Sequence, residues 1–310
     1  MKGWILYFKK SSELTKDDHG VKRLIEEAEK KNISIEVYRP DQFEIIVTSD
    51  EKNSIIIDGV RRPVPDFLIP RMGSSTTYFA LAIIRHLEKL GVFCCNRSHS
   101  IELVKDKLHV HQILAESNLP TPKTMLVKFP VNPKLIRREI GFPAVIKNIS
   151  GTEGKGIHLC KTESDFVDIM ELIYANNKNA NIILQEYIKT SRGKDLRIFM
   201  VGGRPVASMI RSSKKGFKAN YTLGANVEAF EISRELEWLA TEVVRLIGLD
   251  VAGIDVLFNG ENSFKVCEAN SSPGFKGLEL ATGKNIASDI LDYIILNVVS
   301  MLEPEGEAHV

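Results

Sequence analysis

Short apolar runs alternate with amphipathic segments through the first hundred residues. Residues 4–8 form a continuous apolar run of the buried-strand type, and residues 20–31 carry apolar side chains at helical spacing. A second helix is predicted over residues 80–90, and the Asp58-Gly59 pair marks a tight turn. Further strands of the same sheet are expected at 34–38, 45–47, 54–57 and 67–69. This alternation predicts a small α/β lobe over residues 1–97.

Strands and helices follow one another less regularly after this lobe. Strands are predicted at 124–127, 144–146, 157–160, 182–188, 196–201, 205–211 and 251–258, and from 264 onward. Helices are predicted at 98–118, with a break near Asp106, and at 132–140, 166–175, 234–247 and 289–301. The fold class is therefore α/β, of the mixed α+β kind, with two further parts over residues 98–186 and 187–302. Residues 303–310 form an acidic tail that we expect to be inert.

The composition is that of an ordinary globular chain. Its 310 residues are 44% hydrophobic and 26% charged, and the net charge is +1. This balance gives no global reason to expect nucleic acid as a partner, and Arg211–Lys218 is the local basic candidate. No apolar run approaches the roughly 18 residues that span a bilayer, and the apolar start of the chain is too short for a signal peptide. We therefore expect a cytoplasmic protein without a membrane partner.

The four cysteines form no recognisable metal-binding or redox motif. Cys94, Cys95, Cys160 and Cys267 show no C-x-x-C spacing and lie in apolar, strand-like segments. Buried, reduced thiols are the favoured interpretation.

Three oxygen-bearing side chains are expected to meet near the end of the chain. Glu268 and Asn270 are two residues apart, so on a strand they point the same way, and a hairpin back to residues 251–258 brings Asp255 beside them. Hard oxygen ligands, followed by a glycine- and serine-rich turn, suit Mg²⁺ carried by nucleotide phosphates. An ordinary hairpin with polar residues on its wet face is the alternative.

A glycine-rich segment, Gly151-Thr152-Glu153-Gly154-Lys155-Gly156, follows the strand that ends at Lys147. Three glycines in six residues let the backbone approach a ligand and turn amide hydrogens toward phosphate oxygens; a plain hairpin turn is the alternative. The segment is neither a Walker A motif nor G-x-G-x-x-G, and the strand after it places it inside a β-hairpin.

Other polar residues stand at or near the ends of predicted strands. Arg71 follows a strand directly, where an arginine can grip a carboxylate or a phosphate, although a solvated loop arginine is slightly favoured. The segment Gln185-Glu186-Tyr187-Ile188 fits a hinge whose backbone groups read an adenine edge. Asp195 and Arg197 lie two residues apart on one face, so a local salt bridge between them is the simplest interpretation.

The order of these features is more specific than any one of them. They follow one another as Lys107, Lys147, the glycine-rich segment, Gln185–Ile188, Asp195, Arg197, Arg211, Asp255, Glu268 and Asn270. This order resembles the ATP-grasp superfamily and, within it, the RimK-type glutamate ligases that modify the tails of ribosomal proteins. The resemblance extends over nearly the whole chain and implies an ATP-grasp fold behind an N-terminal pre-ATP-grasp lobe.

The resemblance implies four groups of site residues. The residues that would contact ATP are Lys107, Lys147, residues 151–156, Gln185, Glu186, Tyr187, Ile188 and Asp195. The ligands of two Mg²⁺ ions, for which Mn²⁺ is a substitute, would be Asp255, Glu268 and Asn270. The catalytic arginines would be Arg197 and Arg211, and the substrate site would contain Arg71, Asn220 and Gly224.

The implied reaction is an ATP-dependent ligation of a carboxylate to an amine. A carboxylate is a poor electrophile, so it first attacks the γ-phosphate to form an acyl phosphate, and an amine then displaces phosphate. The implied partners are an amino acid and a carboxylate acceptor, which is a protein C-terminus, a peptide or a cofactor precursor. Relatives of this type commonly form homo-oligomers, and the sequence itself does not fix the oligomeric state.

One loop departs from the pattern of the resembled ligases. They carry Arg-Ser-Asn followed by a histidine and an arginine, whereas Lys218–Gly224 keeps Asn220 but has Thr222 and Leu223 at the two charged positions. Glutamate as the added amino acid, and its single or repeated addition, therefore stay open. A phosphotransferase of the same fold and a nucleotide-binding regulatory module without turnover are the rival functions.

Overall fold

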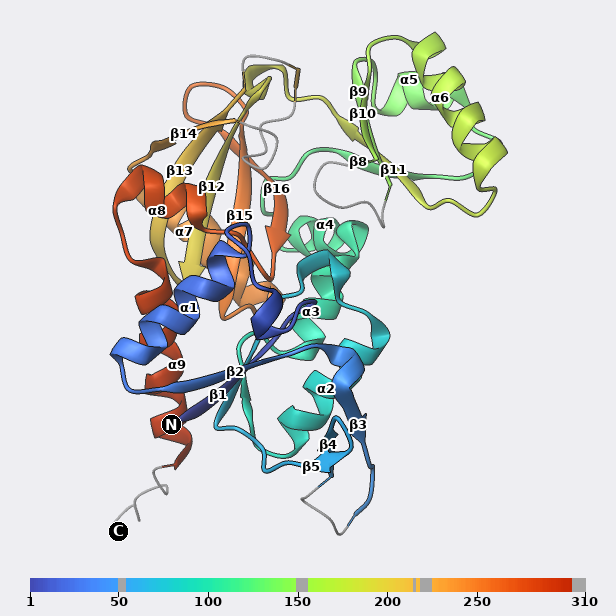
Figure 1. The fold of residues 1–310 in the computed structure, drawn as a ribbon. Coiled ribbons are helices and arrows are strands. Elements are labelled where there is room, and N and C mark those ends of the chain that lie inside the picture. The colour runs from blue at the N-terminus through green and yellow to red at the C-terminus, as the bar shows by residue number, and fades with distance from the viewer. Residues whose placement is uncertain (50–53, 149–155, 214–215, 218–224, 303–310) are drawn as a thin grey trace, which may run out of the picture.

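A parallel sheet with helices packed against it forms the first part of the chain in the computed structural model, which describes residues 1–49, 54–148, 156–213, 216–217 and 225–302 (Figure 1). The strands lie in the order β2-β1-β6-β7. Their bounds are β1 Lys2–Leu6, β2 Ser34–Tyr38, β6 Phe67–Pro70 and β7 Phe93–Cys94, and those of the helices are α1 His19–Lys30 and α2 Tyr78–Lys89. The apolar run of β1 is buried because both sides of the central strands are covered, as in other parallel sheets.

Two predicted strands do not join this sheet. β3 (Phe43–Ile45), β4 (Ile55–Ile57) and β5 (Val60–Arg61) form a separate antiparallel sheet, so the expectation that residues 45–47 and 54–57 extend the main sheet is wrong. The Asp58-Gly59 turn, with φ of 49° and 78°, folds β5 back on β4 as predicted. Phe43 packs against Trp4 of β1, with ring centroids 5.9 Å apart, so the small sheet covers the main sheet instead of lengthening it.

Two short helices lead out of this lobe, α3 (Ser98–Lys105) and α4 (Lys107–Glu116). The Asp106 carboxylate accepts hydrogen bonds from the backbone N–H groups of Leu108 and His109 at 3.0 and 3.1 Å. The predicted break is thus a helix N-cap, and Lys107 is the first residue of α4.

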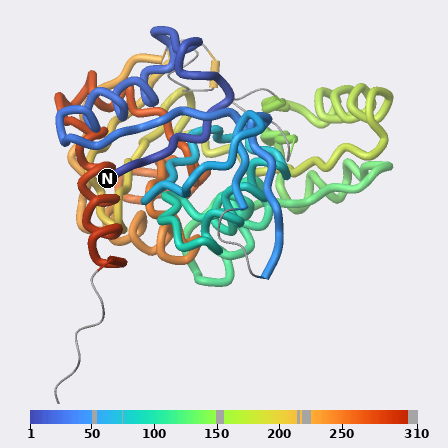
Figure 2. The backbone as a smooth tube through the Cα atoms, turned by 60° about the horizontal axis from the view of Figure 1, so that its bottom comes forward, coloured from blue at the N-terminus to red at the C-terminus, as the bar shows by residue number. Residues whose placement is uncertain are grey.

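The second part of the chain projects from the rest of the molecule (Figures 1 and 2). Its antiparallel sheet has the order β10-β9-β11-β8, with two helices on one face. The bounds are β8 Thr124–Val127, α5 Pro133–Glu139, β9 Ala144–Asn148, β10 Ile157–Cys160, α6 Glu163–Asn176 and β11 Ile182–Glu186. Ile146, Phe166 and Leu184 belong to a core of its own.

The third part is an antiparallel sheet in the order β14-β13-β12-β15-β16. The strands are β12 Lys194–Val201, β13 Arg204–Ser212, β14 Asn226–Ala229, β15 Val251–Phe258 and β16 Phe264–Asn270; the helices are α7 Arg234–Ile247, α8 Lys276–Thr282 and α9 Ile286–Leu302. Short 3₁₀ turns lie at Ser11–Glu13, Pro40–Gln42, Gly73–Ser75 and Lys189–Ser191. The sequence pattern did not predict β14 or α8.

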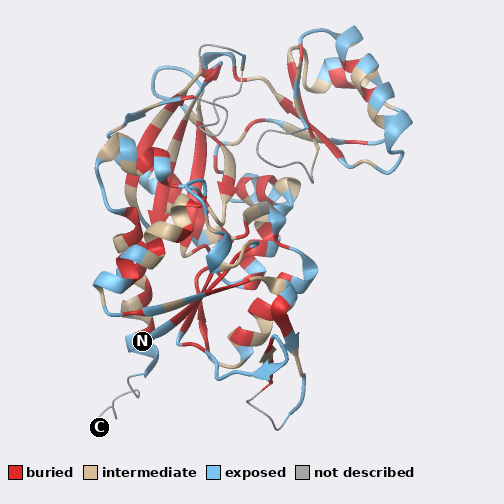
Figure 3. Ribbon diagram, in the orientation of Figure 1, coloured by how far each residue is buried: buried red, intermediate tan, exposed pale blue. Residues whose placement is uncertain are grey.

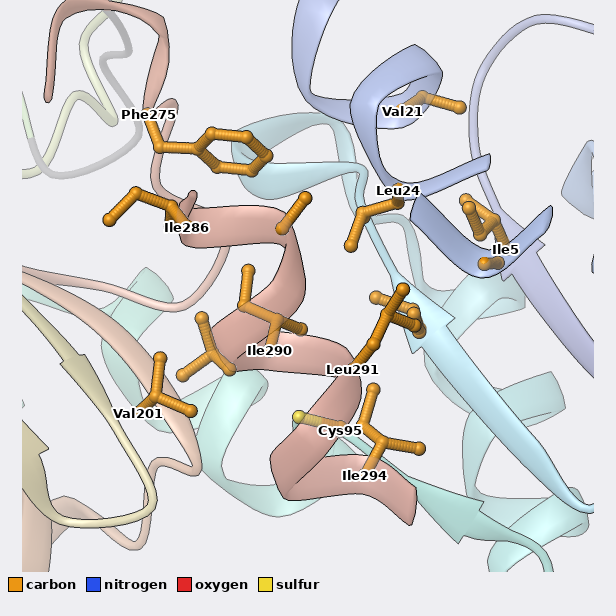
Figure 4. Packing of buried hydrophobic residues seen from close by; sticks show 14 of the residues in the cluster. Ile5, Val21, Leu24, Cys95, Val201, Phe275, Ile286, Ile290, Leu291 and Ile294 are labelled. Atoms are coloured by element: carbon orange, nitrogen blue, oxygen red, sulfur yellow. The ribbon is translucent and has the colours of Figure 1, made fainter. Parts of the chain in front are cut away.

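The strands of this third sheet are largely buried (Figure 3), and apolar side chains pack on both of its faces. Leu196 and Ile198 of β12 share a core with α7, whereas Val201 shares one with α9 and the first lobe. In Figure 4, Ile290 and Leu291 of α9 lie between Val201 and the first lobe. The first lobe, α9 and the sheet that carries the predicted metal ligands therefore share one hydrophobic core.

Within the described ranges, no single helix is long and apolar enough to cross a membrane, although α8 and α9 reach the length and composition together with a bend of 112°.

Candidate nucleotide and metal site

The β15–β16 hairpin brings the three predicted metal ligands onto one face of the sheet. Asp255 lies directly opposite Glu268, and Asn270 lies opposite Gly253, two residues before Asp255. The register shifts by one residue next to Asp255, which leaves Cys267 as the extra residue of a β-bulge. Asn270 is held in place by a hydrogen bond of 3.3 Å from its Nδ2 to the Gly253 carbonyl.

Two arginines from neighbouring strands bind the Asp255 carboxylate. Arg197 donates to both of its oxygens at 2.7 Å, and Arg211 Nη2 lies 3.0 Å from Oδ2. Arg211 also donates to both oxygens of Asp195, at 2.6 and 2.8 Å. The expected local pair of Asp195 with Arg197 is therefore wrong, because each carboxylate is paired with an arginine directly opposite it on the next strand.

Burial sets the electrostatics of this four-residue cluster, in which Arg211 and Asp255 are buried and Asp195 and Arg197 are partly exposed. Only 3% of Arg211 and 7% of Asp255 is exposed. Burial alone would raise the pKa of Asp255, but the charges of Arg197 and Arg211 outweigh it and lower the pKa to about 2. Burial raises the pKa of Asp195, whereas the two carboxylates hold the pKa of Arg211 above its ordinary value despite burial. Asp255 therefore stays ionised.

Both predicted phosphate-contacting lysines lie beside this hairpin. Lys147, near the end of β9, is 8% exposed and donates from Nζ to the Cys267 sulfur at 3.5 Å. Burial lowers the pKa of Lys107, and the charge of Glu268 opposes this change while that of Lys147 adds to it. The two ammonium groups and Glu268 thus share one region between the projecting lobe and β16.

The predicted hinge joins the projecting lobe to β16 through its side chains. Gln185 donates from Nε2 to the Thr124 hydroxyl at 2.8 Å and lies 2.8 Å from His111 Nε2. Glu186 accepts from the backbone N–H of Lys123 at 2.8 Å and forms an ion pair with Lys265 of β16. Because these side chains are already engaged, the backbone of Tyr187 and Ile188 is the better candidate for an adenine contact.

Sequence reasoning missed His111, Lys265 and the placement of Cys267. His111 is buried, and burial lowers its pKa to about 4, with the charge of Lys147 adding to the effect. All four cysteines are free, as predicted, but Cys267 is half-buried beside a charged lysine and not in apolar surroundings. The apolar spacing of α4 gave no sign that His111 points toward the hinge.

Arg71 is not the solvated loop residue that its position favoured. Its Nη2 donates to the Pro273 carbonyl at 2.9 Å, and its guanidinium lies 5.7 Å from the centre of the Phe275 ring. Burial lowers its pKa to about 10. Arg71 thus connects the end of a parallel strand in the first lobe to the turn that follows Asn270.

Part of the glycine-rich segment and of the substrate loop lies outside the described residues. Residues 151–155, with Asn220 and Gly224, belong to these ranges. Gly156 is described: its φ is +73°, and its carbonyl accepts from the Asn148 N–H at 3.1 Å. β9 and β10 on either side pair antiparallel, so the prediction of a glycine-rich loop inside a hairpin is confirmed.

The donor set of the hairpin fits Mg²⁺. In the described part of the chain, no three His, Cys, Asp or Glu side chains gather at metal-binding spacing, so the candidate set is two carboxylates and the Asn270 amide. Oxygen donors with one carboxylate kept ionised suit a hard cation, whereas zinc sites use nitrogen and sulfur.

Comparison with protein families identifies the fold built around these residues. Residues 104–294 match the RimK-like ATP-grasp domain, and residues 13–101 match the RimK PreATP-grasp domain. The chain belongs to the RimK-like ATP-grasp family. The predicted ATP-grasp fold and ATP-dependent carboxylate–amine ligase are confirmed.

Curated members of the RimK-like family cover most of the chain. A protein of Methanococcoides burtonii is 37% identical over 88% of this chain and 90% of its own length, and one of Vibrio parahaemolyticus is 34% identical over 89% and 91%. Both are named probable alpha-L-glutamate ligase.

Solved ATP-grasp structures share the fold. The ATP-grasp ligase PsnB, solved with a variant of its minimal precursor, Mg and ADP, aligns with a TM-score of 0.72 and 18% identity, covering 94% of this chain and 97% of its own. D-alanine–D-alanine ligase from Bacillus anthracis aligns with a TM-score of 0.69 and 17% identity, covering 97% and 98%.

Proposed function

We propose that this RimK-like ligase adds glutamate, or an amino acid close to it, to a carboxylate of a protein or peptide. The observation that carries the proposal is the grouping of Asp255, Glu268 and Asn270 with two arginines and two lysines at one inter-lobe site. The name of the curated relatives supports glutamate, and the PsnB structures with its precursor peptide support a peptide acceptor.

The reaction consists of two displacements at this site. An oxygen of the acceptor carboxylate forms a bond to the γ-phosphorus as the bond to the leaving ADP breaks. The amine nitrogen then bonds to the acyl carbon, phosphate leaves, and the amine proton passes to solvent. Lys107 and Lys147 would offset the phosphate charge, and Arg211 would stabilise the oxyanion formed in the second step.

Asp255, Glu268 and Asn270 would hold two Mg²⁺ ions, with Mn²⁺ as a functional substitute. When bound, the ions neutralise charge on the β- and γ-phosphates. Arg197 and Arg211 would then turn from Asp255 toward the γ-phosphate and the acyl group.

The test is a screen of amino acids against carboxylate acceptors with ADP and phosphate measured in the same reaction. We expect ADP and free phosphate in equal amounts with L-glutamate and a peptide acceptor, and a product heavier by one or more glutamate residues in mass spectrometry. D-glutamate and L-glutamine are the matched controls for the amino acid. ADP without free phosphate would indicate a phosphotransferase, and nucleotide binding without ADP release under any condition would refute the ligase.

A further inference from the structure

Asn96, at the end of the first lobe, is built into the open end of the β15–β16 hairpin. It is 1% exposed, and its side-chain amide makes four hydrogen bonds to backbone groups. Its Oδ1 accepts from the N–H groups of Asp250 and Val251 at 2.7 and 2.8 Å. Its Nδ2 donates to the carbonyls of Val251 and Ser271, both at 2.7 Å.

These bonds let the Asn96 side chain replace a missing strand residue. β16 ends at Asn270, opposite Gly253, so Val251 has no partner on β16. A primary amide carries the same donor and acceptor as a peptide group, and Asn96 bonds both the N–H and the C=O of Val251, as an opposite residue of an antiparallel strand would. The chain can therefore leave the sheet directly after Asn270.

The second Nδ2 hydrogen bond fixes where the chain goes next. The Ser271 carbonyl is held by Asn96, and the Pro273 carbonyl by Arg71. The turn folds back over β15 so closely that a Cβ on Gly253 would lie 2.7 Å from the Pro273 Cβ. Asn270 thus stands between an ordinary strand and a turn held by the first lobe.

We propose that Asn96 is a positioning residue for the metal site, which orients Asn270 and sets its distance from Asp255. The proposal rests on the Mg²⁺ assignment made above. Groups that orient metal ligands typically change metal affinity by about 10- to 100-fold when they are replaced. The first lobe then contributes to metal binding without placing a ligand in the site.

The test is Asn96→Asp, which keeps the acceptor atom but turns a second oxygen toward the Val251 and Ser271 carbonyls. Asn96→Ser, which is too short to reach Ser271, is the second variant in case the first does not fold. Ser100→Ala is the matched control, because the Ser100 hydroxyl also joins the lobes, donating to the Gly248 carbonyl at 2.6 Å, but Gly248 lies before β15 begins and outside the turn that follows Asn270. The readout is binding of a fluorescent ADP analogue as Mg²⁺ is titrated, with EDTA as the zero point and thermal unfolding measured in parallel.

In the Asn96 variants we expect the Mg²⁺ concentration that gives half of the Mg²⁺-dependent binding of the ADP analogue to rise about tenfold or more. Binding of the analogue in EDTA should be unchanged. Ser100→Ala is expected to lower the melting temperature without moving the Mg²⁺ midpoint. A wild-type chain with no Mg²⁺ dependence would overturn the metal assignment and this inference with it. If the wild type depends on Mg²⁺ and a folded Asn96 variant has the same Mg²⁺ midpoint, only the inference about Asn96 is overturned.

Discussion

Replacing Asp255 with asparagine is expected to destabilise the third sheet by about 3 kcal/mol. The substitution keeps the shape of the side chain but removes the charge that both Arg197 and Arg211 bind at 2.7 to 3.0 Å. Two guanidinium groups are then left at a buried site with one carboxylate, that of Asp195. Removing one partner of a buried ion pair typically costs about 3 to 5 kcal/mol.

The pKa of Asp255 gives a second value for the stability that the charge of Asp255 contributes. A folded-state pKa of about 2, against an ordinary value of 3.8, corresponds to about 2 kcal/mol of stability at neutral pH. The remaining Asp195 carboxylate still pairs with Arg211, which places the expected loss at the lower end of the range for buried pairs.

The dependence on pH has a definite sign. The Asp255 pKa is depressed on folding, so its charge stabilises the protein above pH 4, and this contribution is lost as the pH falls from about 4 to about 2. The difference in stability between wild type and Asp255→Asn should therefore be smaller at pH 3 than at pH 7.

Urea unfolding followed by circular dichroism measures this difference. Glu242→Gln is the control, since Glu242 pairs with Arg245 on the surface, where 25% and 63% of the side chains are exposed; its effect on stability should be much smaller than that of Asp255→Asn. Arg197→Met added to Asp255→Asn should recover part of the loss by restoring the charge balance. A loss below about 1 kcal/mol, or one that is the same at pH 3 and pH 7, would refute the reasoning.

Three further results are expected. Glu268→Gln or Asn270→Ala should reduce ADP release on the order of a hundredfold, about 3 kcal/mol, with an unchanged circular dichroism spectrum; near-normal turnover would contradict the metal assignment. Lys147→Met should raise the ATP concentration for half-maximal ADP release about tenfold, because a buried cation beside the phosphates is lost, and an unchanged value would exclude a phosphate contact. Mg²⁺ with ADP should raise the melting temperature, whereas Mg²⁺ alone should not, because Arg197 and Arg211 hold the Asp255 carboxylate. A rise with Mg²⁺ alone would show that the ion displaces these arginines without a nucleotide.

The sequence pattern predicted most elements because the information it carries is local. α7 begins at Arg234 and ends at Ile247 as predicted, since a Ser233 N-cap and the left-handed Gly248 mark its ends. Strand partners are not local, and for this reason the pattern predicted strands at 45–47 and 54–57 but assigned them to the wrong sheet. The helix α8 is only seven residues long, too short for a clear helical period.

The site was predictable up to the point where strand register decides it. Period two places Glu268 and Asn270 on one face, but Asp255 shares that face only because of the bulge at Cys267: if the register of Val256 opposite Val266 continued, Asp255 would lie opposite Cys267. A two-residue turn at Gly202-Gly203 would set Asp195 opposite Ile210 and send Arg211 to the other face. The irregularity between Phe199 and Met200 shifts the register by one, which brings Arg211 opposite Asp195. The spacing of the residues along β12 and β13 does not predict this irregularity.

Charge balance explains how this fold keeps so many ionised groups together. Arg197 and Arg211 against Asp195 and Asp255 sum to zero, so the buried cluster is neutral before any ligand arrives. Mg²⁺ by itself would have to displace two guanidinium groups from the Asp255 carboxylate, and these groups would then lack a negative charge to pair with. A nucleotide brings its own anions, to which the arginines and the nearby lysines can turn while the ion binds the carboxylate. Metal and nucleotide are therefore expected to enter together, and the arginines released from Asp255 become available to the γ-phosphate and the acyl group only once both are present.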